Sequence, residues 1–131
     1  MLEHYRNARY KSGGRGERVG GIRMFDCYGL LRAVRVEQYG LATLPAYEGV
    51  ATDDARRVSR SLCEVQQGLQ PCGVQAGAMA LCWTGALALH CGVVVPLNGL
   101  LGVMECTVDE GVRWQSMRAF SREFTRVEYF T

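Results

Sequence analysis

A cysteine at the start of a predicted helix is the feature that most constrains this 131-residue chain. Asp26 is a common N-cap residue and Gly40 is a typical helix stop. Between them, apolar side chains recur at helical spacing, at Cys27, Leu30, Leu31 and Val34. We therefore predict a helix from Asp26 to Gly40 with Cys27 in its first turn. The unpaired N–H groups and the positive end of the helix dipole favour a thiolate there, so Cys27 is a candidate nucleophile.

The same cysteine has a simpler interpretation. Free cysteines are among the most buried residue types, and most of them serve as small core residues. Taken alone, Cys27 is more simply a core thiol than a catalytic one. The evidence that favours catalysis has to come from the rest of the chain.

Composition limits the class of protein. A chain of this length with 48% apolar residues can bury one sizeable core, which predicts a single domain over residues 1–131. The net charge of +2 does not require a polyanionic partner. The amino terminus carries charges where a signal peptide would be apolar, and no apolar run reaches the roughly 18 residues of a membrane span. We expect a chain made in a cytosol.

The six cysteines are then expected to be free thiols rather than a disulfide framework. The sequence contains no Cys-x-x-Cys pair, so the common zinc-site spacing is absent. A metal site made from Cys82, His90, Cys91 and Cys106 is the weaker alternative. We predict no metal site.

The chain divides into three stretches. Residues 1–24 are polar and rich in arginine and glycine, which predicts a loop or arm. Residues 25–68 form the helical part, where a loop over 41–50 leads to a second helix that Thr52 or Asp53 caps and that ends near Gln67, before Gly68. The arginines of this second helix are expected to face water: Arg56, Arg57 and Arg60.

Residues 77–131 have the pattern of a β-sheet. Five short apolar runs are separated by glycine, proline and asparagine: Ala78–Trp83, Leu89–Val95, Leu101–Thr107, Val112–Gln115 and Arg126–Phe130. Helices that precede a run of strands indicate the α+β class. We predict N-terminal helices packed on one face of an antiparallel sheet of about five strands.

One turn in this sheet fixes a register. Asn98-Gly99 is a strong signal for a two-residue hairpin turn. If it forms that turn, Leu97 pairs with Leu100. The residues before Leu97 then pair in order with the residues after Leu100. A bulge at Gly102 would break the register.

This register brings two polar side chains together. Gly92 would face Glu105, and His90 and Glu105 would project from the same side of the sheet as diagonal neighbours. A histidine oriented by a carboxylate can take a proton from a thiol such as Cys27 and later protonate a leaving amine. Separately, His90 is more simply a core histidine and Glu105 a solvent-facing residue, but together with Cys27 they favour a catalytic site.

A series of motifs occurs in a specific order along the chain. They are Tyr10, Gly13-Gly14, Phe25-Asp26-Cys27-Tyr28-Gly29-Leu30, Gly77-Ala78-Met79-Ala80-Leu81, His90-Cys91-Gly92-Val93-Val94 and Val103-Met104-Glu105-Cys106. This order resembles that of the NlpC family of papain-like cell-wall cysteine peptidases over roughly residues 8–115. Three positions depart from the family pattern: Tyr28 replaces a serine, Ala78 an acidic residue, and Glu105 the commoner histidine.

The resemblance implies a papain-like fold and an endopeptidase that cuts peptidoglycan stem peptides, typically after the D-glutamyl residue. Cys27 would be the nucleophile, His90 the general base and acid, and Glu105 the residue that orients the histidine. Tyr10, Asp26 and Tyr28 match positions that line the substrate cleft. The family implies no metal or cofactor.

The small size and the Leu44-Pro45-x-Tyr47 loop look most like the versions carried at phage tail tips. The partners expected from this resemblance are other tail-tip proteins. The expected location is the host cytoplasm during assembly, and then the virion tail tip at the bacterial cell wall.

Two other functions remain open at this point. The chain could be a structural tail-assembly module that keeps the fold without the activity. The weakest alternative is a nucleic-acid-binding domain that uses the arginines of residues 1–24, although we expect no specific nucleic acid as partner.

Overall fold

The computed structural model describes residues 1–48 and 52–131. Gly49 and Val50, which belong to the predicted loop 41–50, lie outside the described residues. The described helices are α1 (Glu3–Arg6), α2 (Cys27–Tyr39), α3 (Ala55–Gln67) and α4 (Met117–Ser121). The described strands are β1 (Arg9–Tyr10), β2 (Arg15–Val19), β3 (Ile22–Phe25), β4 (Met79–Thr84), β5 (Leu87–Leu97), β6 (Leu100–Thr107), β7 (Gly111–Ser116) and β8 (Arg126–Phe130).

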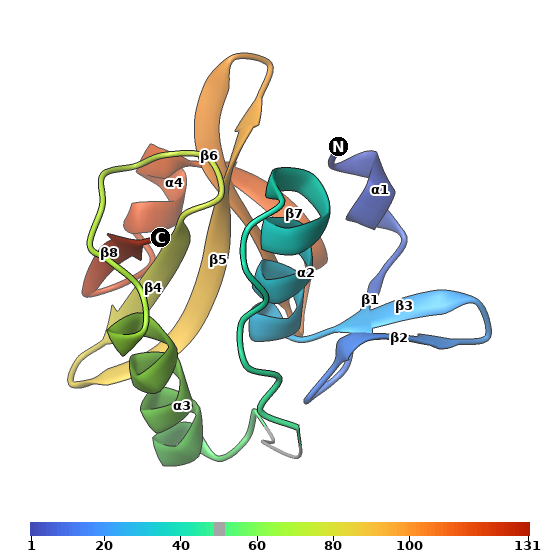
Figure 1. Cartoon of the computed structure of the whole chain (residues 1–131), viewed down its shortest axis with the longest axis horizontal. Helices are drawn as coiled ribbons and strands as arrows, with labels where there is room; N and C mark the ends of the chain where they lie inside the picture. Colours follow the sequence, from blue (N-terminus) through green and yellow to red (C-terminus); the bar gives the residue numbers. More distant parts are fainter. Residues whose placement is uncertain (49–51) are drawn as a thin grey trace.

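A five-stranded antiparallel sheet organises the molecule (Figure 1). Its strand order is β7-β6-β5-β4-β8, so β4 to β7 form a meander and β8 returns to pair with the outer side of β4. All five strands lie within two residues of the predicted runs. The α+β class and the five-stranded sheet predicted from the sequence are confirmed.

The two long helices pack on β5, at the centre of this sheet. Helix α2 begins after Asp26 and ends at Gly40, whose φ of 62° is the left-handed conformation that favours glycine. Helix α3 begins one residue later than expected, because Asp54 rather than Thr52 or Asp53 is the N-cap and accepts a hydrogen bond from the N–H of Arg57 at 3.3 Å.

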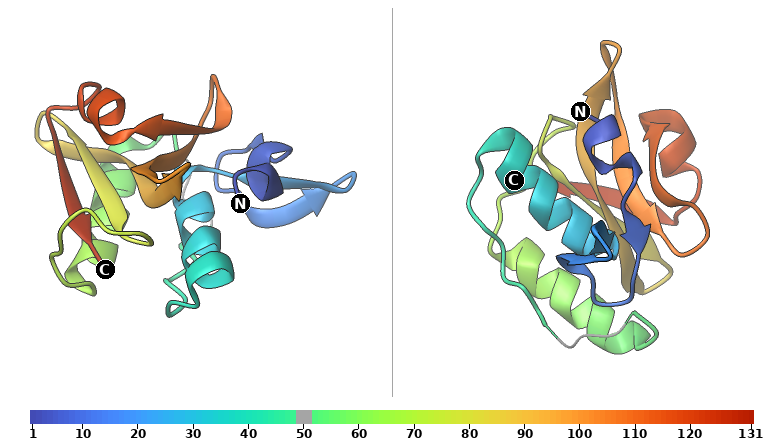
Figure 2. Two further views of the ribbon diagram at one scale, coloured as in Figure 1. Left: turned by 90° about the horizontal axis from the view of Figure 1, so that it is seen from above. Right: turned by 90° about the vertical axis from the view of Figure 1, so that its right-hand side faces the viewer.

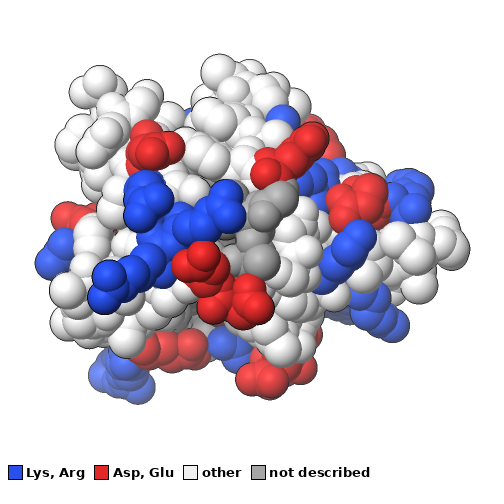
Figure 3. Space-filling model, turned by 90° about the horizontal axis from the view of Figure 1, so that it is seen from below, with Lys and Arg blue, Asp and Glu red and all other residues white. Residues whose placement is uncertain are grey.

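The exposed face of α3 carries its arginines, as predicted: Arg56, Arg57 and Arg60. On the face of the molecule shown in Figure 3, positive side chains lie close to negative ones, and neither sign covers the surface alone.

The prediction that helices cover one face of the sheet is incomplete. Helix α4 lies on the face opposite to α2 and α3 (Figure 2). It buries Phe120 against a small second core of Ala80, Cys82 and Val103. Helix α4 has only five residues, too few to show a helical period in the sequence. Its main local signal is Ser116, whose hydroxyl accepts a hydrogen bond from the N–H of Ala119.

The prediction that residues 1–24 form a loop or arm is wrong. This segment contains α1 and a second sheet of order β1-β3-β2, in which β1 is parallel and β2 antiparallel to β3. Gly20 and Gly21, both at positive φ, make the turn between β2 and β3. Glycine pairs are a hairpin signal as well as a loop signal, and here the hairpin forms. The small sheet leads directly into Asp26 and the start of α2.

Candidate active site

Cys27 lies in the first turn of α2, immediately after β3. Its side chain is nearly buried, with 8% of its surface exposed. The N-cap Asp26 accepts a hydrogen bond from the N–H of Gly29 at 2.7 Å, which fixes the first turn around the thiol. The predicted position of the cysteine at a helix start is confirmed.

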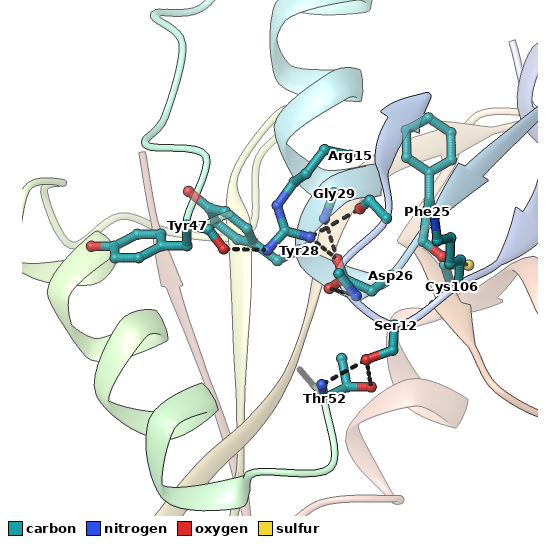
Figure 4. Close-up of polar contacts among 12 residues, drawn as sticks. Ser12, Arg15, Phe25, Asp26, Tyr28, Gly29, Tyr47, Thr52 and Cys106 are labelled. Atoms are coloured by element: carbon teal, nitrogen blue, oxygen red, sulfur yellow. Dashed lines mark hydrogen bonds and ion pairs between the residues drawn. The ribbon is translucent and has the colours of Figure 1, made fainter. Parts of the chain in front are cut away.

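Asp26 is held from three directions. Besides Gly29, its carboxylate accepts from the N–H of Gly13 at 3.2 Å and from Nη1 of Arg15 at 2.7 Å (Figure 4). Burial and the negative charge of Cys27 raise the pKa of Asp26 above its ordinary value, and Arg15 opposes this effect. The carboxylate therefore ties the N-terminal sheet to the helix that carries the thiol.

The predicted hairpin register is confirmed where β5 and β6 are paired. The pairs run from Leu97–Leu100 to Val93–Met104, and Gly102 lies inside this regular ladder. Beyond it, Nε2 of His90 lies 2.7 Å from Oε1 of Glu105. The two side chains meet as the sequence predicted, since the alternation of β-strands places them on one side of the sheet.

Glu105 is almost completely buried, with 1% of its surface exposed. Its second oxygen accepts from Nε of Arg113 at 3.1 Å and from Nε2 of Gln115 at 2.8 Å. Burial raises the pKa of this carboxyl, but the hydrogen bonds of His90 and Gln115 and the charges of His90 and Arg113 outweigh it, so the pKa lies below its ordinary value. Glu105 is therefore an anion next to the imidazole.

Arg113 and Gln115 were not among the residues predicted from the sequence. Both lie on β7, where Arg113 is directly paired with Glu105. A register assigned to the β6–β7 hairpin would have found them, because residues 113 and 115 share one face of the strand.

The His90 ring is fixed by aromatic packing as well as by Glu105. It stacks on Phe124 with ring centroids 5.6 Å apart and an angle of 16° between the planes. Because Nε2 contacts Glu105, Nδ1 is the nitrogen that remains for Cys27. Burial alone would lower the pKa of His90, but the hydrogen bonds and charges of Cys27 and Glu105 raise it to about 10.

The thiol shows the complementary shift. Hydrogen bonding by Cys91, followed by hydrogen bonding and charge from His90, holds the pKa of Cys27 well below its ordinary value despite burial. Together, the two shifts favour a thiolate–imidazolium pair at neutral pH. All six cysteines of the chain are free thiols in this structure.

Two pockets meet at Cys27. The larger one, about 230 Å³, lies on the side of His90 and is also lined by Tyr10 and Thr52. Here the Tyr10 hydroxyl lies 2.5 Å from Oγ1 of Thr52. The smaller pocket, about 20 Å³, lies on the other side and is lined by Asp26 and Tyr28 among others. The residues assigned to a substrate cleft by resemblance, Tyr10, Asp26 and Tyr28, thus all border the thiol, and their contact with substrate stays a prediction.

The shifted pKa of Cys27 predicts the pH dependence of its alkylation. Because the thiolate is the reactive form, the rate with iodoacetamide should stay high as the pH falls from 8.5 to 7, where an unperturbed thiol loses most of its reactivity. Mass spectrometry of the modified peptides between pH 5 and 9 measures this rate. Cys72 is an internal control, because burial raises its pKa and its rate should rise only at alkaline pH. A Cys27 profile that follows that of Cys72 would contradict the thiolate.

The described part of the chain contains no group of three or more His, Cys, Asp or Glu side chains placed to hold a metal ion. It also contains no helix that is long and apolar enough to cross a bilayer.

Comparisons with known proteins add a likeness of fold. No family model matches the chain, and no curated protein matches it in sequence. Among solved structures, it is similar to a protein from Bacteroides fragilis described as a putative xylanase, with a TM-score of 0.51 and 11% identity over 98% of this chain and 97% of that one. This likeness shows a shared fold and nothing about activity.

A second structure matches only in part. It is an N-acetylmuramoyl-L-alanine amidase from Bacteroides uniformis ATCC 8492, with a TM-score of 0.37 and 13% identity over 44% of this chain. The chain spans 28% of the length of that amidase. A match of this size carries no argument about the chain.

Proposed function

We propose that this protein is a cysteine endopeptidase that hydrolyses peptidoglycan stem peptides. The observation that carries the peptidase part is that Cys27 and His90 line the same cavity, while His90 lies 2.7 Å from the buried Glu105. Support for a cell-wall substrate comes from the motif series around Cys27, His90 and Glu105 and its resemblance to the NlpC family.

The geometry supports the following reaction. The Cys27 thiolate attacks the scissile carbonyl, and a C–S bond forms. The His90 imidazolium donates its Nδ1 proton to the leaving amine as the C–N bond breaks, which leaves a thioester on Cys27. Neutral His90 then takes a proton from water as the water oxygen attacks the thioester. The thiolate departs, and the thiolate–imidazolium pair is restored.

Two protein groups assist this reaction without changing covalently. The backbone N–H of Cys27, in the first turn of α2, is free of an intrahelical partner and can donate to the oxyanion. Removing one such donor costs about 3–4 kcal/mol in other enzymes. Glu105 holds Nε2 of His90 throughout and stabilises the imidazolium.

The biological setting is proposed on the resemblance alone. We propose a component of a phage tail tip that aids penetration of the cell wall. It would be made in the host cytoplasm, assembled with other tail-tip proteins and carried on the virion. A catalytically silent tail-assembly module of the same fold is the second candidate, and the low exposure of Cys27 favours it.

Digestion of purified peptidoglycan tests the proposed function. We expect the protein to release soluble fragments whose masses identify a cut within the stem peptide, and Cys27→Ala to release none. Thermal unfolding of both proteins verifies that the variant is folded. Equal release by Cys27→Ala would exclude the cysteine mechanism. A folded wild-type protein that leaves peptidoglycan from several hosts intact would favour the silent module.

Glu105→Gln tests the role of the carboxylate as a positioning residue. The variant keeps the shape of the side chain but removes the charge that stabilises the imidazolium, so we expect kcat to fall on the order of 10²-fold or more. Without that charge the pKa of His90 falls, and the imidazolium is lost at a lower pH. The alkylation profile of Cys27 should therefore move toward that of an ordinary thiol.

Glu123→Gln is the matched control for this variant. Glu123 also accepts hydrogen bonds from Arg113 and Gln115, at 3.3 Å and 2.9 Å, but it is exposed and is not hydrogen-bonded to His90. We expect its kcat and its alkylation profile to match those of the wild-type protein. Similar losses of kcat in the two variants would indicate that the hydrogen bonds of Glu105 and Glu123 with Arg113 and Gln115 have only a structural role.

A further inference from the structure

The pocket on the far side of Cys27 from His90 is bordered by an anchored tyrosine, Tyr28. The Tyr28 hydroxyl donates a hydrogen bond to the carbonyl oxygen of Pro45. The Arg15 guanidinium lies over the Tyr28 ring at 5.1 Å from its centroid, and the Tyr47 ring meets it edge-on at 5.9 Å. In Figure 4 the Arg15 guanidinium lies between Asp26 and the carbonyl oxygen of Tyr47, with Tyr28 beside it. The Tyr28 ring cannot move aside without losing contacts on three sides.

Little space remains in this pocket. Its volume of about 20 Å³ is room for about one water molecule. The opposite wall is made by Val58 and Val65 of α3, which are buried. A substrate group that enters must therefore be small, and most of what it meets is apolar.

The two charged side chains at the edge of this pocket, Arg15 and Asp26, are already paired. Nη1 of Arg15 donates to the carboxylate of Asp26 at 2.7 Å and to the carbonyl oxygen of Gly14 at 2.9 Å. Nε of Arg15 donates to the carbonyl oxygen of Ala46 at 2.5 Å. The Asp26 carboxylate accepts from Gly13, Arg15 and Gly29. A charged substrate side chain would lose its water here, and the two charged groups it could pair with are already bound to each other, which makes its entry costly.

The proposed reaction determines which part of the substrate faces this pocket. His90 protonates the leaving amine, so the leaving group must lie within hydrogen-bond distance of His90, in the larger pocket. The acyl part of the substrate then extends from Cys27 to the other side. The small pocket is therefore an acyl-side subsite.

We propose that Tyr28 is a specificity-determining residue that restricts this subsite to glycine or alanine. The acyl-side residue whose side chain enters the pocket carries nothing larger than a methyl group. A glutamyl carboxylate has to lie outside the pocket. This inference rests on the proposed function, and it names the substrate residue that the same site selects.

Peptidyl chloromethyl ketones test the inference without a cleavable bond. The Cys27 thiolate displaces chloride from the probe, a C–S bond forms, and the peptide occupies only the acyl side. Each of the two residues before the ketone is varied through glycine, alanine, valine and leucine, in both configurations. Mass spectrometry measures the second-order rate of Cys27 labelling. At one of the two positions, we expect valine and leucine to react at least about 10-fold more slowly than alanine.

Variants of the residues that line the pocket test whether they cause this selectivity. Tyr28→Ala should reduce the alanine-to-leucine rate ratio at that position at least about 10-fold. Tyr28→Phe, which keeps the ring and loses only the hydroxyl, should retain the wild-type ratio. Val65→Ala widens the opposite wall and should also reduce the ratio, so the test holds even if Tyr28→Ala does not fold. Thermal unfolding identifies the folded variants.

The outcomes separate this inference from the proposed function. Equal labelling by all probes in the wild-type protein, or a ratio unchanged in both folded wall variants, would overturn the inference even if peptidoglycan is cut. The expected ratios in a protein that cuts no peptidoglycan would support the subsite and refute the wall substrate.

Discussion

Cys27→Ala, His90→Ala and the double variant are all expected to reduce peptide hydrolysis to the same residual rate, at least about 10³-fold below the wild-type rate. The reason is that the two side chains act as one unit. Without the imidazole, Cys91 still lowers the pKa of the thiol, but the hydrogen bond and charge of His90 no longer do, and the leaving amine has no proton donor. Without the thiol, His90 has no nucleophile to activate. The effects of such residues are strongly non-additive.

Initial rates on a soluble stem peptide measure these three variants. Cys72→Ala is the matched control, because it removes a partly exposed thiol that does not line either pocket at Cys27. We expect its rate to equal that of the wild-type protein. Losses that multiply in the double variant would show that Cys27 and His90 act independently, which would contradict the proposed mechanism.

Gly29→Ala is expected to destabilise the fold by about 3 kcal/mol, although alanine is the better helix former. A Cβ atom at this position would lie 2.0 Å from the carbonyl oxygen and 3.0 Å from the carbonyl carbon of Gly14. These are backbone atoms that cannot rotate away, so the first turn of α2 would have to separate from the residues before β2. Helix propensity alone predicts the opposite sign, so the direction of the change is itself informative.

Thermal and urea unfolding measure this effect, and the midpoint temperature should fall by roughly 10 °C. Gly73→Ala is the control, because a Cβ at Gly73 has open space around it. Its stability should stay within about 0.5 kcal/mol of the wild-type value. An unchanged midpoint for Gly29→Ala would mean that α2 and the Gly14 segment are not in the contact described.

The parts of the fold predicted correctly depend on local signals. Asp26 and Gly40 delimit α2 because each terminal residue satisfies the helix end next to it in the sequence. Asn98-Gly99 determines the register of β5 and β6, and the register in turn brings His90 to Glu105. The contact between His90 and Glu105 is therefore predictable from one short motif.

The parts that were missed depend on contacts between distant segments. The strands of residues 1–24 are short and partly exposed, and they are defined by pairing with one another rather than by an apolar pattern. The Tyr10–Thr52 contact joins residues 42 positions apart, and the Arg15–Tyr47 contact joins residues 32 positions apart. No local pattern encodes such partners.

The hydrogen bonds between the small N-terminal sheet and the start of α2 have a practical consequence for anyone who trims this chain. Gly13 and Arg15 hold the carboxylate that caps the helix of Cys27, and Tyr10 borders the cavity beside it. A shortened version that starts at residue 25 would keep Cys27, His90 and Glu105. It would lose the hydrogen bonds of Gly13 and Arg15 with Asp26, which position the first turn of α2. We expect the first turn of α2 to be less stable in such a fragment and Cys27 to be less well positioned.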